Sequence, residues 1–312
     1  MHMLIVKNVE KIFKKRIKTV TSVRQVWSWL KNIFVPKYEK FQALKWINFE
    51  INQWEKVAFI WPNGAGKSTT IKAILWILHY DKWEIKVWNM DPKKQRKEIS
   101  KFTSSVFGQR SQLLYHLPLM DSFNFFKIIY DIPQDVFEKR LDRFVKRFKI
   151  DEFINQPVRK LSLGQRMKWE IVASLLHSPK AIFLDEPTIG LDIIAKKVLY
   201  EILNEIHKEE NITIFLTSHD LKDVENLCDR AVVINRWEIL YDGQIDDLMK
   251  KYANKKFISY KEKWSLDWNY IEVPNEPKFV ESAIKELYEK KEIEDLEIQN
   301  VPLEEIIEQF YK

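Results

Sequence analysis

The stretch VAFIWPNGAGKSTTIKAILWIL, residues 57–78, is the most informative part of this sequence. An apolar run typical of a buried strand leads into a short loop with two glycines, and an apolar helical pattern follows. Small residues in such a loop let backbone N–H groups surround phosphate oxygens, and the N-terminus of the next helix adds its positive end. A chance Gly-Lys-Ser on a surface loop would lack the strand and the helix, so we interpret residues 61–70 as a phosphate-binding loop.

The polar residues of this loop have separate predicted roles. Lys67 supplies a cation to the β- and γ-phosphates of a nucleotide, and the Ser68 hydroxyl is placed to bind Mg²⁺. The other residues predicted to hold the nucleotide here are Trp61, Pro62, Asn63, Gly64, Ala65, Gly66 and Thr69.

A second element of the phosphate site is AIFLDE, residues 181–186, where a buried apolar strand ends in two carboxylates. Asp185 is predicted to hold Mg²⁺, directly or through water, and Glu186 to act as the general base that polarises the attacking water. Two acids after a strand carry little weight alone. Together with the Lys67 loop they indicate nucleotide hydrolysis.

Four motifs occur in a fixed order along the chain: WPNGAGKSTT at 61–70, LSLGQR at 161–166, FLDEPTIGLD at 183–192 and TSHD at 217–220. Over roughly residues 3–250 the chain therefore resembles the ATP-binding subunit of ABC transporters. The position of LSLGQR shortly before Asp185 makes the resemblance specific. The segment FGQRSQLLYHLP and the lysine-rich insert after Phe13 are similar to a branch of exporter ATPases whose permease is a separate chain.

The resemblance implies roles for residues outside the phosphate loop. Gln109 fits the glutamine that senses Mg²⁺ and contacts the permease, and His219 fits the switch histidine that hydrogen-bonds the γ-phosphate and orients water. Asp192 fits the D-loop. Phe13 aligns with the aromatic residue that stacks on adenine, although tyrosine is the better match there.

The resemblance also implies a signature loop at Ser162, Gly164 and Gln165, which in the family caps the γ-phosphate of ATP bound to the opposite subunit. Gly164 opens the helical stretch QRMKWEIVASLL, so a second helix N-terminus is expected to point at the anion. Leu163 replaces the more frequent glycine of the signature, a variation that fits this branch.

The expected fold is α/β, a P-loop NTPase parallel sheet covered by helices, because strands and helices alternate after residue 158. We expect an ATP-binding domain over residues 1–248, with an antiparallel β subdomain, a helical subdomain at about 101–157 and a basic insert at about 14–40. Residues 249–312 are expected to form a small C-terminal accessory domain.

The expected function is that of an ATPase subunit that drives export through a separate membrane permease. One set of motifs per chain predicts a homodimer that closes around two ATP molecules. One alternative is a soluble ABC-type ATPase acting on nucleic acid or ribosomes, although the chain has neither a second ATPase unit nor a long coiled coil. The other is a nucleotide-binding regulator with little turnover, against which Glu186 and His219 both argue.

Composition limits the compartment and the partners. The chain has 312 residues and one cysteine, which excludes an internal disulfide and disfavours a Cys-based zinc site. No apolar run suits a membrane span, and no signal-peptide layout is seen, so we expect a peripheral protein at the cytoplasmic face of the membrane. Residues 11–40 are strongly basic. They are interpreted as a solvated helical arm or as a contact with the anionic membrane surface, and no nucleic acid is expected.

Glycine and tryptophan occur in unusual numbers, 6 and 12 among 312 residues. Some tryptophans stand in tight turns, at a helix end or at the first position of the phosphate loop, where the backbone favours glycine. Our hypothesis is that UGA codons read as glycine in some bacteria were translated here as tryptophan; the alternative is a genuine but degenerate ATPase. The positions are Trp46, Trp54, Trp61, Trp76, Trp83 and Trp237, with Trp27, Trp29, Trp88, Trp169, Trp264 and Trp268 undecided.

Overall fold

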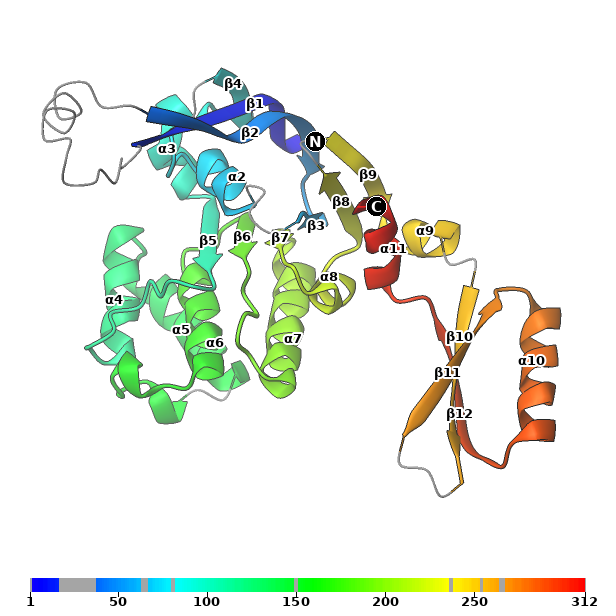
Figure 1. Ribbon diagram of the computed structural model, residues 1–312. Coiled ribbons are helices and arrows are strands. Elements are labelled where there is room, and N and C mark those ends of the chain that lie inside the picture. Colours follow the sequence, from blue (N-terminus) through cyan, green and yellow to red (C-terminus); the bar gives the residue numbers. More distant parts are fainter. Residues whose placement is uncertain are drawn as a thin grey trace, which may run out of the picture.

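A six-stranded sheet in the order β5-β6-β7-β3-β8-β9 lies at the centre of the computed structural model (Figure 1). Neighbouring strands are parallel except for β9, which pairs antiparallel with β8. The structure describes residues 2–16, 38–62, 67–79, 82–148, 151–235, 238–252, 255–263 and 267–311. The strands are β3 (Lys56–Ile60), β5 (Thr103–Phe107), β6 (Ala181–Asp185), β7 (Thr213–Thr217), β8 (Arg230–Asn235) and β9 (Glu238–Gln244).

Side-chain alternation along these strands produces two apolar layers, because successive residues of a strand point to opposite faces of the sheet. In β6, Ile182 and Leu184 face one core, and Ala181 and Phe183 face the other. The first core is covered by α4 (Leu119–Ile129), α5 (Gln134–Phe148), α6 (Leu163–Leu175), α7 (Ile193–Glu210) and α8 (Leu221–Leu227). The second core is covered by α2 (Lys67–Ile74) and α3 (Pro92–Ser100). The predicted α/β fold is confirmed.

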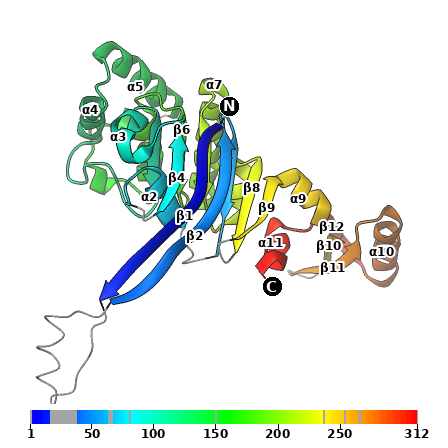
Figure 2. The same ribbon diagram turned by 90° about the horizontal axis from the view of Figure 1, so that it is seen from above.

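A second sheet, in the order β2-β1-β4, is antiparallel and closes the second core. Its strands are β1 (His2–Arg16), β2 (Tyr38–Asn52) and β4 (Lys82–Val87). Figure 2 shows the outer ends of β1 and β2 running together away from the body as a long arm. Most of the basic insert predicted at 14–40 falls at residues 17–37, outside the described residues.

The C-terminal region divides between a small separate unit and the main body. Strands β10 (Lys255–Glu262), β11 (Trp268–Pro274) and β12 (Ile293–Asn300) form a sheet in the order β11-β10-β12, and α10 (Pro277–Lys290) packs on it around Ile258 and Leu287. The two flanking helices are α9 (Ile245–Tyr252) and α11 (Leu303–Tyr311). Both bury side chains in the first core described above, which is called the main core from here on. The expected boundary at 248/249 therefore falls inside α9, and the segment after β12 returns to the body (Figure 1).

Short 3₁₀ helices at Asp151–Phe153 and Val158–Lys160 connect α5 to α6.

Among the described residues, no helix has the length and apolar character that crossing a membrane requires.

Of the tryptophans that the structure describes, four adopt the left-handed backbone conformation that favours glycine: Trp46 (φ 54°), Trp54 (φ 66°), Trp76 (φ 52°) and Trp88 (φ 48°). Trp76 follows the end of α2, where its N–H donates to Ala73 O (3.0 Å) and the next N–H, of Ile77, donates to Lys72 O (2.7 Å). This is the Schellman arrangement that usually places glycine at this position. It also explains why α2 ends at Ile74, earlier than the apolar pattern predicts.

Trp88, which the sequence left undecided, forms a two-residue hairpin turn with Asn89, whose φ is also positive at 61°. Val87 and Met90 exchange both backbone hydrogen bonds across this turn at 2.9 Å, and such a type I′ turn favours glycine. Trp83, expected in a turn, lies inside β4 instead, so that expectation was wrong.

The remaining tryptophans differ in their surroundings. Trp61 follows β3 and is buried, whereas Trp237 lies outside the described residues. The indole N–H groups of Trp88 and Trp169 are buried and have no hydrogen-bond acceptor among the described residues, which is unusual for native tryptophans.

The first prediction concerns Trp54, whose indole is 63% exposed while its backbone is left-handed. Trp54→Gly should raise the free energy of unfolding by about 1 kcal/mol, because glycine removes the steric cost of the left-handed conformation. Trp54→Ala should give no such gain, because its Cβ meets the same strain. Chemical denaturation of the three proteins measures the difference.

Trp268 provides the matched control, since it is also exposed but lies within β11. Trp268→Gly should lower stability, because glycine weakens a strand. Peptide masses of protein from its natural source test the decoding hypothesis directly. Glycine is expected at positions 54, 76 and 88, and tryptophan at those positions would refute the hypothesis.

His177, two residues after the end of α6, is half-buried and stacks on Tyr130, with ring centroids 3.7 Å apart and nearly parallel rings. Its Nε2–H donates to the carbonyl oxygen of Thr103 (3.2 Å). Burial lowers the pKa of His177 from 6.5 to about 4, since a charged imidazolium would lose its hydration there.

The second prediction follows from that pKa. Between pH 6.5 and about 4 the unfolded chain binds a proton at His177 that the folded chain does not, so this residue makes stability fall as the pH falls. The accumulated loss is about 3 kcal/mol, at about 1.4 kcal/mol per pH unit. His177→Gln should flatten the decline in unfolding free energy across this range. An equal decline in both proteins would contradict the assignment.

Candidate functional site

The carboxyl ends of β6 and β7 hold the predicted Mg²⁺ ligand in place. Asp185 pairs in register with Thr217, and the Thr217 hydroxyl donates to Asp185 Oδ1 (2.8 Å). Asp185 is only 8% exposed, so this hydrogen bond fixes one carboxylate oxygen in a nearly dry position.

Glu186, the residue after Asp185, contacts two other predicted site residues, Lys67 and His219. Lys67 Nζ lies 3.4 Å from Glu186 Oε1 and also donates to Trp61 O (3.1 Å). The His219 backbone N–H donates to Glu186 Oε2 (3.3 Å), and the His219 ring nitrogen Nδ1 hydrogen-bonds to the same oxygen. Glu186 itself has a positive φ of 53°, a strained conformation of the kind that gathers at functional sites. A carboxylate between an ammonium and an imidazole can accept a proton from water.

The predicted Gln109 follows a glycine that the site requires. Gly108 N–H donates to Asp185 O (2.8 Å), and a Cβ at Gly108 would lie 1.9 Å from Glu186 O. Only glycine lets the two segments approach so closely. Gln109 is exposed directly beside this contact.

Glu170, inside α6, was missed by sequence reasoning. It is 4% exposed and accepts hydrogen bonds from the Ser111 hydroxyl and from the Gln112 N–H, at 2.9 and 3.1 Å to its two oxygens. Burial raises the pKa of Glu170. The helix that begins at the signature loop is thereby joined to the segment after Gln109. The only signal in the sequence was an acid within the apolar stretch WEIVASLL.

The signature residues form a helix cap. Ser162 is the N-cap of α6, its hydroxyl accepts from Gln165 N (3.2 Å), and the Gln165 side chain accepts from Ser162 N (2.9 Å). The two remaining N–H groups of the first turn and the helix dipole make this end attractive to an anion. A Cβ at Gly164 would lie 2.8 Å from the Cβ of Ala195, so the two helix starts touch.

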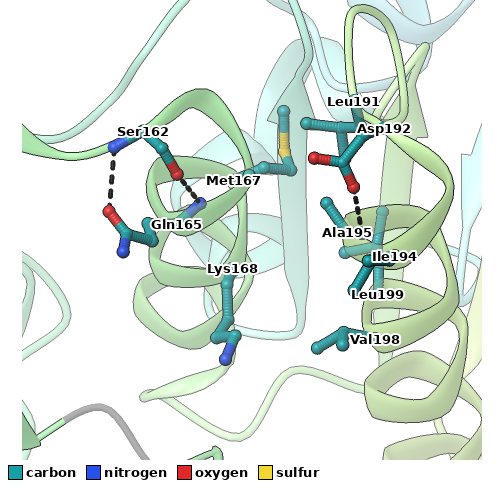
Figure 3. Close-up of a pocket in the computed structure, with 11 residues that line it drawn as sticks. Ser162, Gln165, Met167, Lys168, Leu191, Asp192, Ile194, Ala195, Val198 and Leu199 are labelled. Atoms are coloured by element: carbon teal, nitrogen blue, oxygen red, sulfur yellow. Dashed lines mark hydrogen bonds between the residues drawn. The ribbon is translucent and has the colours of Figure 1, made fainter.

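Asp192 is the N-cap of the neighbouring α7 and accepts from Ala195 N (2.8 Å). Figure 3 shows the two caps on facing helices, on either side of a cavity of about 260 Å³. Its described lining includes Ser162, Gly164 and Asp192 but not Lys67 or Glu186. The predicted site residues therefore form two groups in one chain.

The remaining predicted site residues belong to neither of these two groups of contacts. Phe13 lies on the β1–β2 arm, partly exposed, with Lys11 Nζ 5.5 Å from its ring centroid. Its contact with adenine stays a prediction. Ser68 and Thr69 lie in the first turn of α2, and Pro62 lies two residues after the end of β3. Asn63, Gly64, Ala65 and Gly66 lie outside the described residues.

The predicted Mg²⁺ ligands suit that ion. Ser68, Gln109 and Asp185 offer hydroxyl, amide and carboxylate oxygens, the donors that Mg²⁺ prefers. Asp185 keeps one carboxylate oxygen outside the Thr217 hydrogen bond. In the part of the chain that the structure describes, no cluster of three or more His, Cys, Asp or Glu side chains could hold a metal. Hydroxyl, amide and carboxylate oxygens fit a Mg²⁺ ion that is shared with nucleotide phosphates.

Comparison with known proteins agrees with this geometry. The family model described as ABC transporter matches residues 44–189. The chain is 29% identical over 238 residues to the ABC transporter ATP-binding protein NatA of Bacillus subtilis, covering 76% of this chain and 92% of NatA. It is 32% identical to the energy-coupling factor transporter ATP-binding protein EcfA2 of Clostridium perfringens, covering 69% and 76%. It is 28% identical to the bacitracin transport ATP-binding protein BcrA of Bacillus licheniformis, covering 72% and 71%.

A solved structure has the same fold. The ATP-binding cassette MJ0796, a dimer in a post-hydrolysis state bound to ADP and Pi, superposes with a TM-score of 0.63 at 21% identity, covering 78% of this chain and 99% of that chain.

The third prediction concerns Glu170. Glu170→Gln keeps an oxygen that can accept from both Ser111 and Gln112, but it removes the charge and replaces the second oxygen, 3.1 Å from Gln112 N, by an N–H₂ donor that opposes the Gln112 N–H. We expect unfolding free energy to fall by about 1–3 kcal/mol and the Gln112 amide to exchange its hydrogen faster. Ser111→Ala, which leaves the Gln112 bond in place, should slow exchange relative to Glu170→Gln. Unchanged Gln112 exchange in Glu170→Gln would contradict the prediction.

Proposed function

The chain belongs to the ABC transporter family, as an ATP-binding subunit that hydrolyses ATP, and we propose that it powers export through a permease encoded as a separate chain. The observation that carries the ATPase part of this proposal is the contact of both Lys67 and His219 with the Glu186 carboxylate. The likeness to BcrA, named for bacitracin transport, supports export over import.

In the proposed mechanism Glu186 takes a proton from the attacking water. The backbone N–H and ring of His219 hold Oε2, which aims the other oxygen of the carboxylate. Lys67 Nζ, at the start of α2, adds positive charge where the β- and γ-phosphates are held by the helix N-terminus. Mg²⁺ held by Ser68, Gln109 and Asp185 would neutralise phosphate charge when bound.

We propose a homodimer because the signature group and the Lys67–Glu186 group are separate in one chain. A second copy would bring the capped N-terminus of its α6 to the phosphate held by the first. Ile193 and Ile194, beside the Asp192 cap, are 86% and 78% exposed, as expected of side chains that a partner covers. The dimeric MJ0796 cassette supports this arrangement.

The helical subdomain offers the surface proposed for the permease. Phe125, Ile128 and Ile129 form an exposed apolar stripe on α4. Ser122 of the same helix accepts from Leu114 N (2.9 Å), which connects α4 to the segment after Gln109. We propose on this basis that the subunit binds its permease at the cytoplasmic face of the membrane. The contact of the basic insert with the membrane surface stays a prediction.

The fourth prediction tests the site. Glu186→Gln should lower phosphate release at least about 100-fold while leaving ATP bound, because the general base is lost but the phosphate loop is intact. The variant should then elute as a dimer with ATP. Lys67→Ala is the control that should fail to bind ATP and stay monomeric. Chromatography with labelled ATP and a phosphate assay measure both properties.

A Glu186→Gln protein that releases phosphate like the natural protein would overturn the role of Glu186. Adding Ile193→Asp to Glu186→Gln should abolish the ATP-dependent dimer, since it buries a charge at the proposed contact. A dimer that survives this change would place the interface elsewhere.

A further inference from the structure

Asp223, on the first turn of α8, is a fully buried carboxylate for which the proposed mechanism has no role. Its Oδ2 accepts from the hydroxyls of Thr188 and Ser218, the latter at 2.6 Å, and its Oδ1 accepts from the Tyr200 hydroxyl at 2.6 Å. The Lys196 ammonium lies 3.7 Å from Oδ1 and supplies the nearest described positive charge. A buried carboxylate is stable in this position because several donors replace its lost water.

The Ser218 bond fixes the loop that carries the switch histidine. Ser218 Oγ donates to Asp223 and at the same time accepts from Asp220 N (3.0 Å). These two bonds bracket His219, the residue between them. Because a hydroxyl has a single proton, its donation to Asp223 leaves the lone pairs for Asp220.

The Thr188 bond fixes the loop that carries the general base. Thr188 is 3% exposed and lies two residues after Glu186. Its carbonyl accepts from Leu191 N (3.0 Å), and Glu186 O accepts from Ile189 N (3.4 Å), so it lies within the turn that begins at the strained Glu186. Its hydroxyl anchors that turn to the same carboxylate oxygen that Ser218 uses.

Tyr200 and Lys196 extend the network to α7, the helix that Asp192 caps. Burial and the neighbouring Asp223 charge raise the pKa of Tyr200, so its hydroxyl stays protonated and continues to donate. Lys196 also pairs with Asp220, the N-cap of α8. The Asp223 carboxylate thus contacts the loop that carries Glu186, the loop that carries His219, and α7, the helix that begins at the proposed dimer contact.

We propose that Asp223 is a positioning residue of the ATPase, which holds Glu186 and His219 in register through Thr188 and Ser218 and couples both to α7 through Tyr200. The inference rests on the proposed roles of Glu186 and His219. The described hydrogen bonds and ion pairs of Asp223 go to Thr188, Ser218, Tyr200 and Lys196, and none of them reaches Lys67 or the start of α2. Its loss is therefore expected to affect turnover and not ATP affinity.

The fifth prediction uses two changes that keep the volume of the side chain. Asp223→Asn removes the charge and turns one acceptor into a donor, and Thr188→Val removes one hydroxyl. Both should lower kcat at least tenfold while the KM for ATP changes less than twofold. Thr188→Ser, which keeps the hydroxyl, should retain kcat within threefold. The double variant should lose less than the product of the two single effects, because both act through one contact.

Leu203→Ala controls for stability. Leu203 is buried on α7 in the main core, so this change should lower the melting temperature without lowering kcat at a temperature where the protein is folded. Asp223→Asn with kcat near that of the natural protein, or Thr188→Ser as impaired as Thr188→Val, would overturn the inference. If Asp223→Asn fails to fold, the Thr188 pair decides the question alone.

Glu186→Gln measured alongside separates this inference from the proposed function. If Glu186→Gln is inactive but Asp223→Asn and Thr188→Val are fully active, only the positioning role fails. If Glu186→Gln is as active as the natural protein, the proposed role of Glu186 itself fails.

Discussion

The parallel register of β3, β6 and β7 is the constraint on which the whole site depends. Because the three strands point the same way, their carboxyl ends meet at one edge of the sheet, and the segments that follow them carry Lys67, Glu186 and His219. The alternation of side chains in each strand fixes that register, since a slip by one residue would turn Phe183 and Phe215 away from the aromatic cluster of the second core. Core packing and site geometry are thus specified together.

Part of the candidate site could be predicted from local sequence. The phosphate loop and the acids after β6 were predicted from the buried strand that precedes each of them, and the role of the histidine after β7 was predicted from the resemblance to a known family. Glu170 and Asp223 were not, because a helix acid that accepts distant donors looks like an ordinary surface acid in the sequence. Their partners, such as Ser111 and Thr188, lie far along the chain, and only the folded structure brings them together.

The tryptophans likewise divide into those whose backbone conformation could be predicted from the sequence and those for which it could not. Trp54 and Trp76 were identified as glycine-like from turn and helix-end patterns, and the backbone has the expected left-handed φ. Trp88 was left undecided because an indole ring is tolerated on a helix or a strand, whereas the chain reverses there. Trp83 was misplaced because a turn was assumed one residue too late, after β4 had already begun. The helix α2 also ends before the apolar pattern does, because the left-handed backbone of Trp76 stops it. The spacing of apolar residues carries no information about this backbone conformation.

The attachment of the small C-terminal unit has an entropic consequence. Both of its ends are attached to the main body, because α9 before it and α11 after it pack in the same core. If its sheet unfolds, residues 255–300 form a loop with both ends held rather than a free tail. Such a loop gains less conformational entropy on unfolding than a free tail of the same length. The unit buries few side chains of its own around Ile258 and Leu287, so tethering at two points supplies part of the order that its modest core lacks.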